Sequence, residues 1–300
     1  MTQKVFDKIK ILKNVFIPAL HQKFKIQVSQ TSQFESLIYK LNGNICIDHG
    51  ATRTFDPKTF SLIKRIGSAL GLDPHHEYSF PKKKIYSIDL QTPNEDGFKW
   101  FSSLIDYKAF PKDIVNAIEE TNYRHPLLPE KSLNFLEKIE ISGFLEENEA
   151  YEFVNDILYK FCSNNGNFIK RKNLEIIQSF SQKIANAILI GPDFNHIAYS
   201  LNHIGIQEWY GTEIIEVLKE FLIENGFTMT PSILGDICGP LRQTSTLAEH
   251  HHFWIKNENN QIEKIFYPSK FLEFIQRKPE NEKKFKNGKI NLFQGFLKDF

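Results

Sequence analysis

One acidic residue stands inside an apolar segment near the end of the chain. Residues 271–277 read Phe-Leu-Glu-Phe-Ile-Gln-Arg, a pattern typical of a buried β-strand. Alternation along a strand puts Glu273 on one face between Phe271 and Ile275. A carboxylate among apolar neighbours is costly unless it is paired, hydrogen-bonded or bound to a metal. The alternative is an edge strand with Glu273 in water, since most glutamates on strands are exposed.

Two histidines far upstream stand at the starts of predicted strands. His49 lies in the segment CIDHG (46–50), and His196 lies in FNHI (194–197). Two imidazoles and one carboxylate from separate strands are the ligands of a facial iron triad, which leaves positions open for substrate and oxygen. Either histidine alone is more often structural than a ligand, and His203 is a rival to His196. If the three side chains meet, the chain is a non-haem iron enzyme.

Two further polar segments are candidates for substrate binding. Arg53 follows His49 by four residues in a stretch of small and hydroxylated side chains. A guanidinium binds a carboxylate through two parallel hydrogen bonds, whereas the alternative is a surface arginine in a solvated turn. The segment RQTST (242–246) suits the polar wall of a small-molecule site or, equally, a solvent-facing strand.

Two histidine clusters carry less weight. In EHHH (249–252), adjacent side chains on a strand point to opposite faces, so only His250 and His252 could bind one ion. This cluster is a weaker metal candidate than the triad. His75 and His76 follow Pro74 in a predicted loop, and the sequence assigns them no role.

The predicted elements repeat in order. In residues 30–110, the strand of His49 precedes a helix that begins at Asp56-Pro57 and stops near Gly71, and strands follow at 84–92 and 98–106. In residues 191–280, the strand of His196 precedes a helix from about Thr212 to Gly226, with strands at 241–254 and 264–277. Helical periodicity fills 111–190. We therefore expect an α+β fold: one domain over 1–300, with two βαβββ units forming a curved sheet around a metal cleft and a helical insertion.

Charge and cysteine content restrict the classes of partner. The 37 basic and 36 acidic residues leave a net charge of +1, which creates no field to attract nucleic acid or anionic lipid. The three cysteines lack CxxC spacing and fit a reducing cytosol better than a disulfide framework or a thiolate zinc site. No uninterrupted apolar run is long enough for a membrane span or a signal peptide. We expect a cytoplasmic protein with no nucleic-acid or membrane partner.

Four segments together resemble a known family. They are DHGATRTF (48–55), FNH (194–196), RQTST (242–246) and FLEFIQR (271–277). In this order they resemble the 2-oxoadipate dioxygenase/decarboxylase family, also called 2-hydroxyglutarate synthase, whose fold is related to the vicinal oxygen chelate superfamily. The resemblance spans about residues 30 to 280.

The resemblance implies a reaction and its residues. His49, His196 and Glu273 would bind Fe(II), and Arg53 would bind a substrate carboxylate near the metal as the catalytic positioning group. Gln243 and Ser245 are our own additions to the substrate-binding set. The implied reaction converts 2-oxoadipate and O₂ to 2-hydroxyglutarate and CO₂, in lysine degradation. The alternatives are another metal-dependent enzyme of the same superfamily (an isomerase, a lyase or a ring-cleaving dioxygenase) and a metal-free binding protein.

Overall fold

The structure is a computed structural model that describes residues 4–93, 97–121, 127–163, 168–209 and 213–278. These residues form two compact units, each assembled from three segments of the chain. The first unit takes its described residues from the ranges Met1–Lys23, Ala51–Asn195 and His250–Ser269, and the second takes them from Phe24–Gly50, His196–Glu249 and Lys270–Phe300. The predicted boundaries at 30–110, 111–190 and 191–280 stay a prediction.

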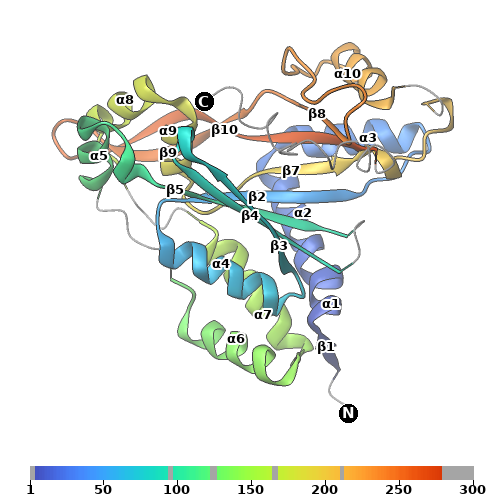
Figure 1. Cartoon of the computed structure of the whole chain (residues 1–300), viewed down its shortest axis with the longest axis horizontal. Coiled ribbons are helices and arrows are strands. Elements are labelled where there is room, and N and C mark those ends of the chain that lie inside the picture. Colours follow the sequence, from blue (N-terminus) through green and yellow to red (C-terminus); the bar gives the residue numbers. More distant parts are fainter. Residues whose placement is uncertain (1–3, 94–96, 122–126, 164–167, 210–212, 279–300) are drawn as a thin grey trace. The chain divides into compact units, whose positions relative to one another are not determined.

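An antiparallel sheet organises the first unit. Strands β3 (Asp73–Phe80), β4 (Ile85–Gln91) and β5 (Lys99–Ile105) pair in chain order and lie side by side in Figure 1. The sheet continues from β5 to the Ala51–Thr54 half of β2 (Ile47–Thr54). Trp100 on β5 is fully buried and donates a hydrogen bond from Nε1 to Thr52 Oγ1 at 3.0 Å. Strand β9 (Glu249–Lys256) pairs with β10 (Ile262–Arg277), and the first unit contains their residues from His250 to Ser269.

Helix α4 (Pro57–Ala69) packs on β3, β4 and β5, and it begins and ends for local reasons that the sequence contains. The side chain of Asp56 accepts a hydrogen bond from Thr59 N at 2.6 Å, and Pro57 fills the first helical position. Beyond the helix, Gly71 has a φ of +76°, which glycine adopts without strain. These residues also predict the helix from the sequence alone.

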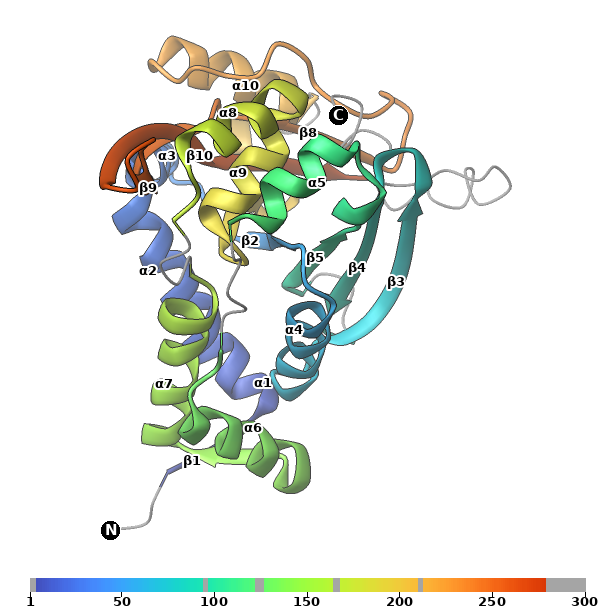
Figure 2. The ribbon, with the colours of Figure 1, turned by 90° about the vertical axis from the view of Figure 1, so that its left-hand side faces the viewer.

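Most of the described residues between 111 and 190 are helical, in agreement with the periodicity of that segment. The helices are α5 (Lys112–Glu119), α6 (Glu130–Ser142), α7 (Glu147–Asp156) with its π-helical extension (Ile157–Phe161), α8 (Arg171–Phe180) and α9 (Gln182–Ile190). Strand β6 (Phe144–Glu146), between α6 and α7, pairs with β1 (Val5–Asp7). Figure 2 shows α6, α7 and β1 beside one another. In the parts of the chain that the structure describes, no helix combines the length and apolarity needed to cross a membrane.

The second unit has a mixed sheet with β10 in an interior position. Strand β10 pairs in parallel with β7 (Phe194–Ser200) on one side and antiparallel with β8 (Leu241–Ser245) on the other. Helix α3 (Ser29–Lys40) places the ring of Phe34 against Tyr199 and Phe274, with ring centroids 4.7 and 4.9 Å apart. Helix α10 (Ile214–Glu224) follows β7 in the chain.

The expected α+β class is confirmed, and the elements follow the expected order. β2, α4, β3, β4 and β5 form one βαβββ series, and β7, α10, β8, β9 and β10 form the other. Three expectations differ in detail. The segment 241–254 is two strands, β8 and β9, and 73–80 is the strand β3 instead of a loop around His75 and His76. The N-terminal helices α1 (Lys8–Ile11), α2 (Ile17–Gln27) and α3 were not anticipated.

Candidate metal centre

The strand register of the second unit brings the predicted triad together. Phe271 pairs with His196, and Glu273 pairs with Ala198, so His196 and Glu273 project from the same face of neighbouring strands. His49 comes from β2. One ligand atom from each of His49, His196 and Glu273 lies within 4.8 Å of the other two. Glu273 Oε1 is 3.3 Å from His49 Nε2, and Glu273 Oε2 is 4.0 Å from His196 Nε2. Three residues that are far apart in sequence therefore converge.

All three side chains are withdrawn from solvent. His49, His196 and Glu273 are 0%, 1% and 4% exposed, and Phe271 stacks on the His196 ring with a centroid distance of 4.8 Å. The edge-strand alternative for Glu273 is therefore wrong, because β10 has a partner on both sides. Burial raises the pKa of the Glu273 carboxyl, although His49 opposes the shift. A divalent cation would offset the cost of this buried charge, and a donor set of two imidazole nitrogens and a carboxylate suits Fe(II).

A second carboxylate orients His49. Asp48 Oδ1 lies 2.8 Å from His49 Nδ1, and Arg277 holds Asp48 with two parallel hydrogen bonds, Nε to Oδ2 at 2.9 Å and Nη2 to Oδ1 at 2.7 Å. Burial alone would raise the pKa of Asp48, but Arg277 and His49 outweigh it and hold this pKa well below its usual range. An ionised Asp48 favours the His49 tautomer with a proton on Nδ1. In this tautomer Nε2, which faces Glu273, carries the lone pair that can bind a metal.

Neither Asp48 nor Arg277 has a role predicted from the sequence. Both lie inside the segments that carry the family resemblance, and an acid directly before a candidate histidine ligand is a usable signal. The end of β10 is also tied in place, because Arg277 N donates to Asn202 Oδ1 at 2.8 Å and Asn202 Nδ2 donates to Arg277 O at 2.7 Å. The guanidinium therefore projects from an anchored backbone.

Of the three candidate substrate-binding residues, two belong to the unit that contains the triad and one does not. Across the antiparallel pair of β8 and β10, Ser245 is opposite Glu273 and Gln243 is opposite Ile275, so both project from the face that carries Glu273. Gln243 is buried, and its Oε1 has no hydrogen-bond partner in the described part of the chain. Arg53 is half-buried on β2 and belongs to the first unit, so its role at the triad stays a prediction.

The other histidine candidates have structural partners. Glu249 accepts hydrogen bonds from Ser29 N at 3.1 Å and Gln30 N at 2.7 Å, which caps α3. The rings of His250 and His252 lie against Phe266, with centroids 5.1 and 5.0 Å away.

His251 Nδ1 is 2.7 Å from Ser269 Oγ. His203, the rival to His196, is exposed and has its Nδ1 3.0 Å from Ser200 Oγ. Neither belongs to the group formed by the triad.

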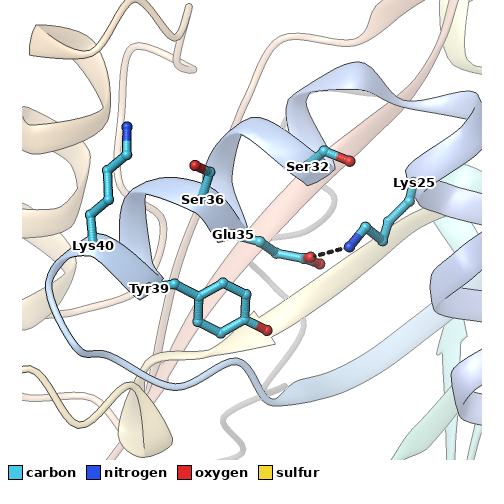
Figure 3. A pocket seen from close by; sticks show the side chains of 6 residues that line it. All are labelled: Lys25, Ser32, Glu35, Ser36, Tyr39 and Lys40. Carbon is cyan, nitrogen blue, oxygen red and sulfur yellow. Dashed lines mark hydrogen bonds and ion pairs between the residues drawn. The ribbon is translucent and has the colours of Figure 1, made fainter.

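A pocket of about 480 Å³ also lies in the second unit, over α2 and α3, and it is separate from the triad. Its lining comprises Lys25, Ser32, Glu35, Ser36, Tyr39 and Lys40. Figure 3 shows Lys25 paired with Glu35, and Tyr199 Oη donates to the same carboxylate at 3.2 Å. Tyr199 alternates along its strand with His196 and Ala198, so α3 covers the opposite face of these strands.

Comparison with known proteins agrees with this architecture. The family model for 2-oxoadipate dioxygenase/decarboxylase matches residues 18–289. A structure assigned to the glyoxalase superfamily, from Ralstonia eutropha JMP134, has a TM-score of 0.79 at 18% identity and covers 90% of this chain and 84% of its own. The hydroxyglutarate synthase of Oryza sativa, solved with 2-oxoadipate, has a TM-score of 0.62 at 18% identity and covers 92% and 84%. No match was found among curated proteins.

We expect Asp48→Asn to lower the free energy of unfolding by about 1–3 kcal/mol, because Arg277 loses its charged partner while the side-chain volume is kept. Urea unfolding measures this difference. The control Asp106→Asn changes an exposed aspartate and should stay within about 0.5 kcal/mol of the wild type. Equal unfolding midpoints for Asp48→Asn and the wild type would show that the ion pair with Arg277 does not stabilise the fold.

Proposed function

This chain belongs to the 2-oxoadipate dioxygenase/decarboxylase family, and on that premise we propose that it is a non-haem Fe(II) enzyme that converts 2-oxoadipate and O₂ to 2-hydroxyglutarate and CO₂. The observation that carries this proposal is the convergence of His49, His196 and Glu273, whose ligand atoms lie within 4.8 Å of one another in a buried position. A cytoplasmic location and a place in lysine degradation are parts of the same proposal.

The proposed division of labour follows from the chemistry of each group. Fe(II), when bound, supplies the oxygen chemistry that amino-acid side chains lack. His49, His196 and Glu273 would hold it from one side and leave the remaining positions to substrate and oxygen. The overall reaction balances without an added reductant, because the 2-oxo acid itself loses CO₂ and gives up the electrons. No separate 2-oxoglutarate is therefore needed.

The remaining residues would bind and orient the substrate. Arg53 follows His49 by four residues on β2, and strand alternation gives positions 49 and 53 the same face. Its guanidinium would bind a substrate carboxylate and determine which carbon faces the metal. Gln243 and Ser245 on β8 project from the same face of the sheet as Glu273 on β10. They would form hydrogen bonds with the polar end of the substrate. Apolar neighbours such as Phe271 would exclude water.

The test is oxygen consumption by anaerobically purified, Fe(II)-loaded protein, with a panel of 2-oxo acids that differ in chain length. We expect uptake with 2-oxoadipate and an equal amount of 2-hydroxyglutarate, identified by mass. Metal-dependent turnover without oxygen uptake would instead indicate an isomerase or lyase of the same superfamily. Protein that binds no metal under these conditions would indicate a binding protein.

Loss of a ligand should remove both iron and activity. We expect His49→Ala and Glu273→Gln to lower iron affinity and turnover by roughly 10²-fold or more, because each removes one of three protein donors. Iron content by elemental analysis and oxygen uptake measure the two effects. The exposed His203→Ala is the matched control and should keep both. Full iron content in Glu273→Gln would show that the carboxylate is not a ligand.

Arg53→Ala should separate substrate binding from metal binding. Loss of a charge-assisted hydrogen-bonding group of about 1.5–3 kcal/mol predicts a KM for 2-oxoadipate higher by roughly 10- to 10²-fold, with iron content unchanged. Arg65→Ala is the control, since Arg65 is an exposed arginine paired with Glu140 on α6. An unchanged KM for Arg53→Ala would exclude Arg53 from the substrate site.

A further inference from the structure

We propose that His75, His76 and Asp89 form a second site for a divalent transition-metal ion, across the edge strand β3 and its neighbour β4 in the first unit. This site is independent of the proposed function, because its three residues lie on β3 and β4 and none of them belongs to the triad. One ligand atom from each lies within 4.8 Å of the other two. The ligand class is a late first-row cation such as Zn²⁺.

A β-bulge brings the two histidines to the same side. Adjacent side chains on a regular strand point to opposite faces, which would keep His75 and His76 apart. In the pairing of β3 with β4, however, Pro74 is opposite Leu90 and His76 is opposite Asp89, so His75 is an extra residue. A bulge of this kind redirects a side chain, and bulges occur often beside functional sites. Here the two rings lie 3.8 Å apart between centroids, almost perpendicular at 84°.

The three atoms that would bind the metal lie close together. His75 Nδ1 and His76 Nδ1 are 2.7 Å apart, and Asp89 Oδ2 is 3.8 Å from the first and 3.4 Å from the second. In the metal-free protein one of these two nitrogens donates a hydrogen bond to the other, whereas a cation between them would accept both lone pairs. A cation can therefore satisfy the three atoms at once.

The carboxylate is held in place before any ion binds. Asp89 is buried, at 4% exposure, and its Oδ1 accepts the backbone N–H of His76 at 2.8 Å. That hydrogen bond directs Oδ2 towards the imidazoles. The side chains of His75 and His76 are about half exposed, at 49% and 50%, so an ion there would keep positions for water. One buried anchor and two accessible donors make a site that an ion from solution can enter.

The donor types restrict the ion. Two imidazole nitrogens and one carboxylate oxygen suit Zn²⁺, Ni²⁺ or Cu²⁺, whereas Mg²⁺ and Ca²⁺ prefer sites made of oxygen atoms alone. With Zn²⁺, the three residues and one water complete a tetrahedral shell. The ion would bridge β3 to β4. Since β3 is the outermost strand in the order β3-β4-β5, this bridge would fasten an edge strand that pairs with β4 and packs against α4.

Zinc stoichiometry tests the site. Metal-free protein carrying Glu273→Gln, which disables the proposed triad, should bind Zn²⁺ in one equivalent by calorimetry or chelator competition. Adding His75→Asn and His76→Asn should weaken this binding at least 10-fold, since asparagine keeps a hydrogen-bonding group but is a poor zinc ligand. Adding His203→Ala instead should leave it unchanged. The same zinc affinity with and without the two asparagine substitutions would overturn the proposal.

A stability measurement provides the second readout. In the Glu273→Gln background, Zn²⁺ should raise the unfolding temperature, and the two asparagine substitutions should abolish this rise. Unfolding in the absence of metal shows that the substituted chain still folds. In protein with an intact triad, the asparagine substitutions should leave iron content and oxygen uptake unchanged. A zinc-induced rise of equal size in the presence of both substitutions would contradict the site.

Discussion

The buried carboxylate of Glu273 is the constraint on which the second unit depends. A charged group at 4% exposure destabilises a fold unless its neighbours compensate, and here two imidazoles are within 4.0 Å of its oxygens. Asp48 then orients one of those imidazoles, and Arg277 neutralises Asp48. In this series of contacts, each group lowers the free-energy cost of burying its neighbour. Removing one of these groups leaves its buried partner uncompensated and destabilises the fold. Substitutions in such a network are therefore seldom neutral.

The two faces of the central strands of the second unit have different tasks. On one face, Phe34 packs between Tyr199 and Phe274, and the Glu35 carboxylate accepts hydrogen bonds from Tyr199 and Lys25. On the other face, the same two strands, β7 and β10, project His196 and Glu273. Because successive side chains alternate, the aromatic packing on the α3 face limits how far the strand backbone can shift on the other face. Rigid strands position donor atoms better than loops do.

The sequence predicted most of this fold where the signals were local. Helix α4 was predicted from Asp56, Pro57 and Gly71, which act within a few residues. Strand β3 was missed because its residues are mostly exposed and lack apolar alternation, so only pairing with β4 makes it a strand. The bulge at His75 was missed for the same reason, because the pairing register depends on both strands and not on the sequence of one.

The convergence of His49, His196 and Glu273 could be predicted from the sequence, whereas the pairing of Asp48 with Arg277 could not. Glu273 is conspicuous among apolar neighbours, and the histidines begin predicted strands. The partnership of Asp48 and Arg277 joins positions 229 residues apart, and no local pattern reports it. Glu249 was grouped with the histidines beside it because adjacency suggested a cluster, but its carboxylate caps α3 instead. Side-chain partners across the fold are the part that sequence patterns leave undetermined.

The wide spacing of His49, His196 and Glu273 has a consequence during synthesis on the ribosome. The carboxylate is translated more than two hundred residues after the first imidazole. A growing chain therefore has at most two of the three donors until β10 emerges and takes its place beside β7. If the three residues hold iron as proposed, the ion would be captured only after β10 has been translated and has paired with β7. Incomplete polypeptides would be spared the oxidative damage that a loosely held ion inflicts.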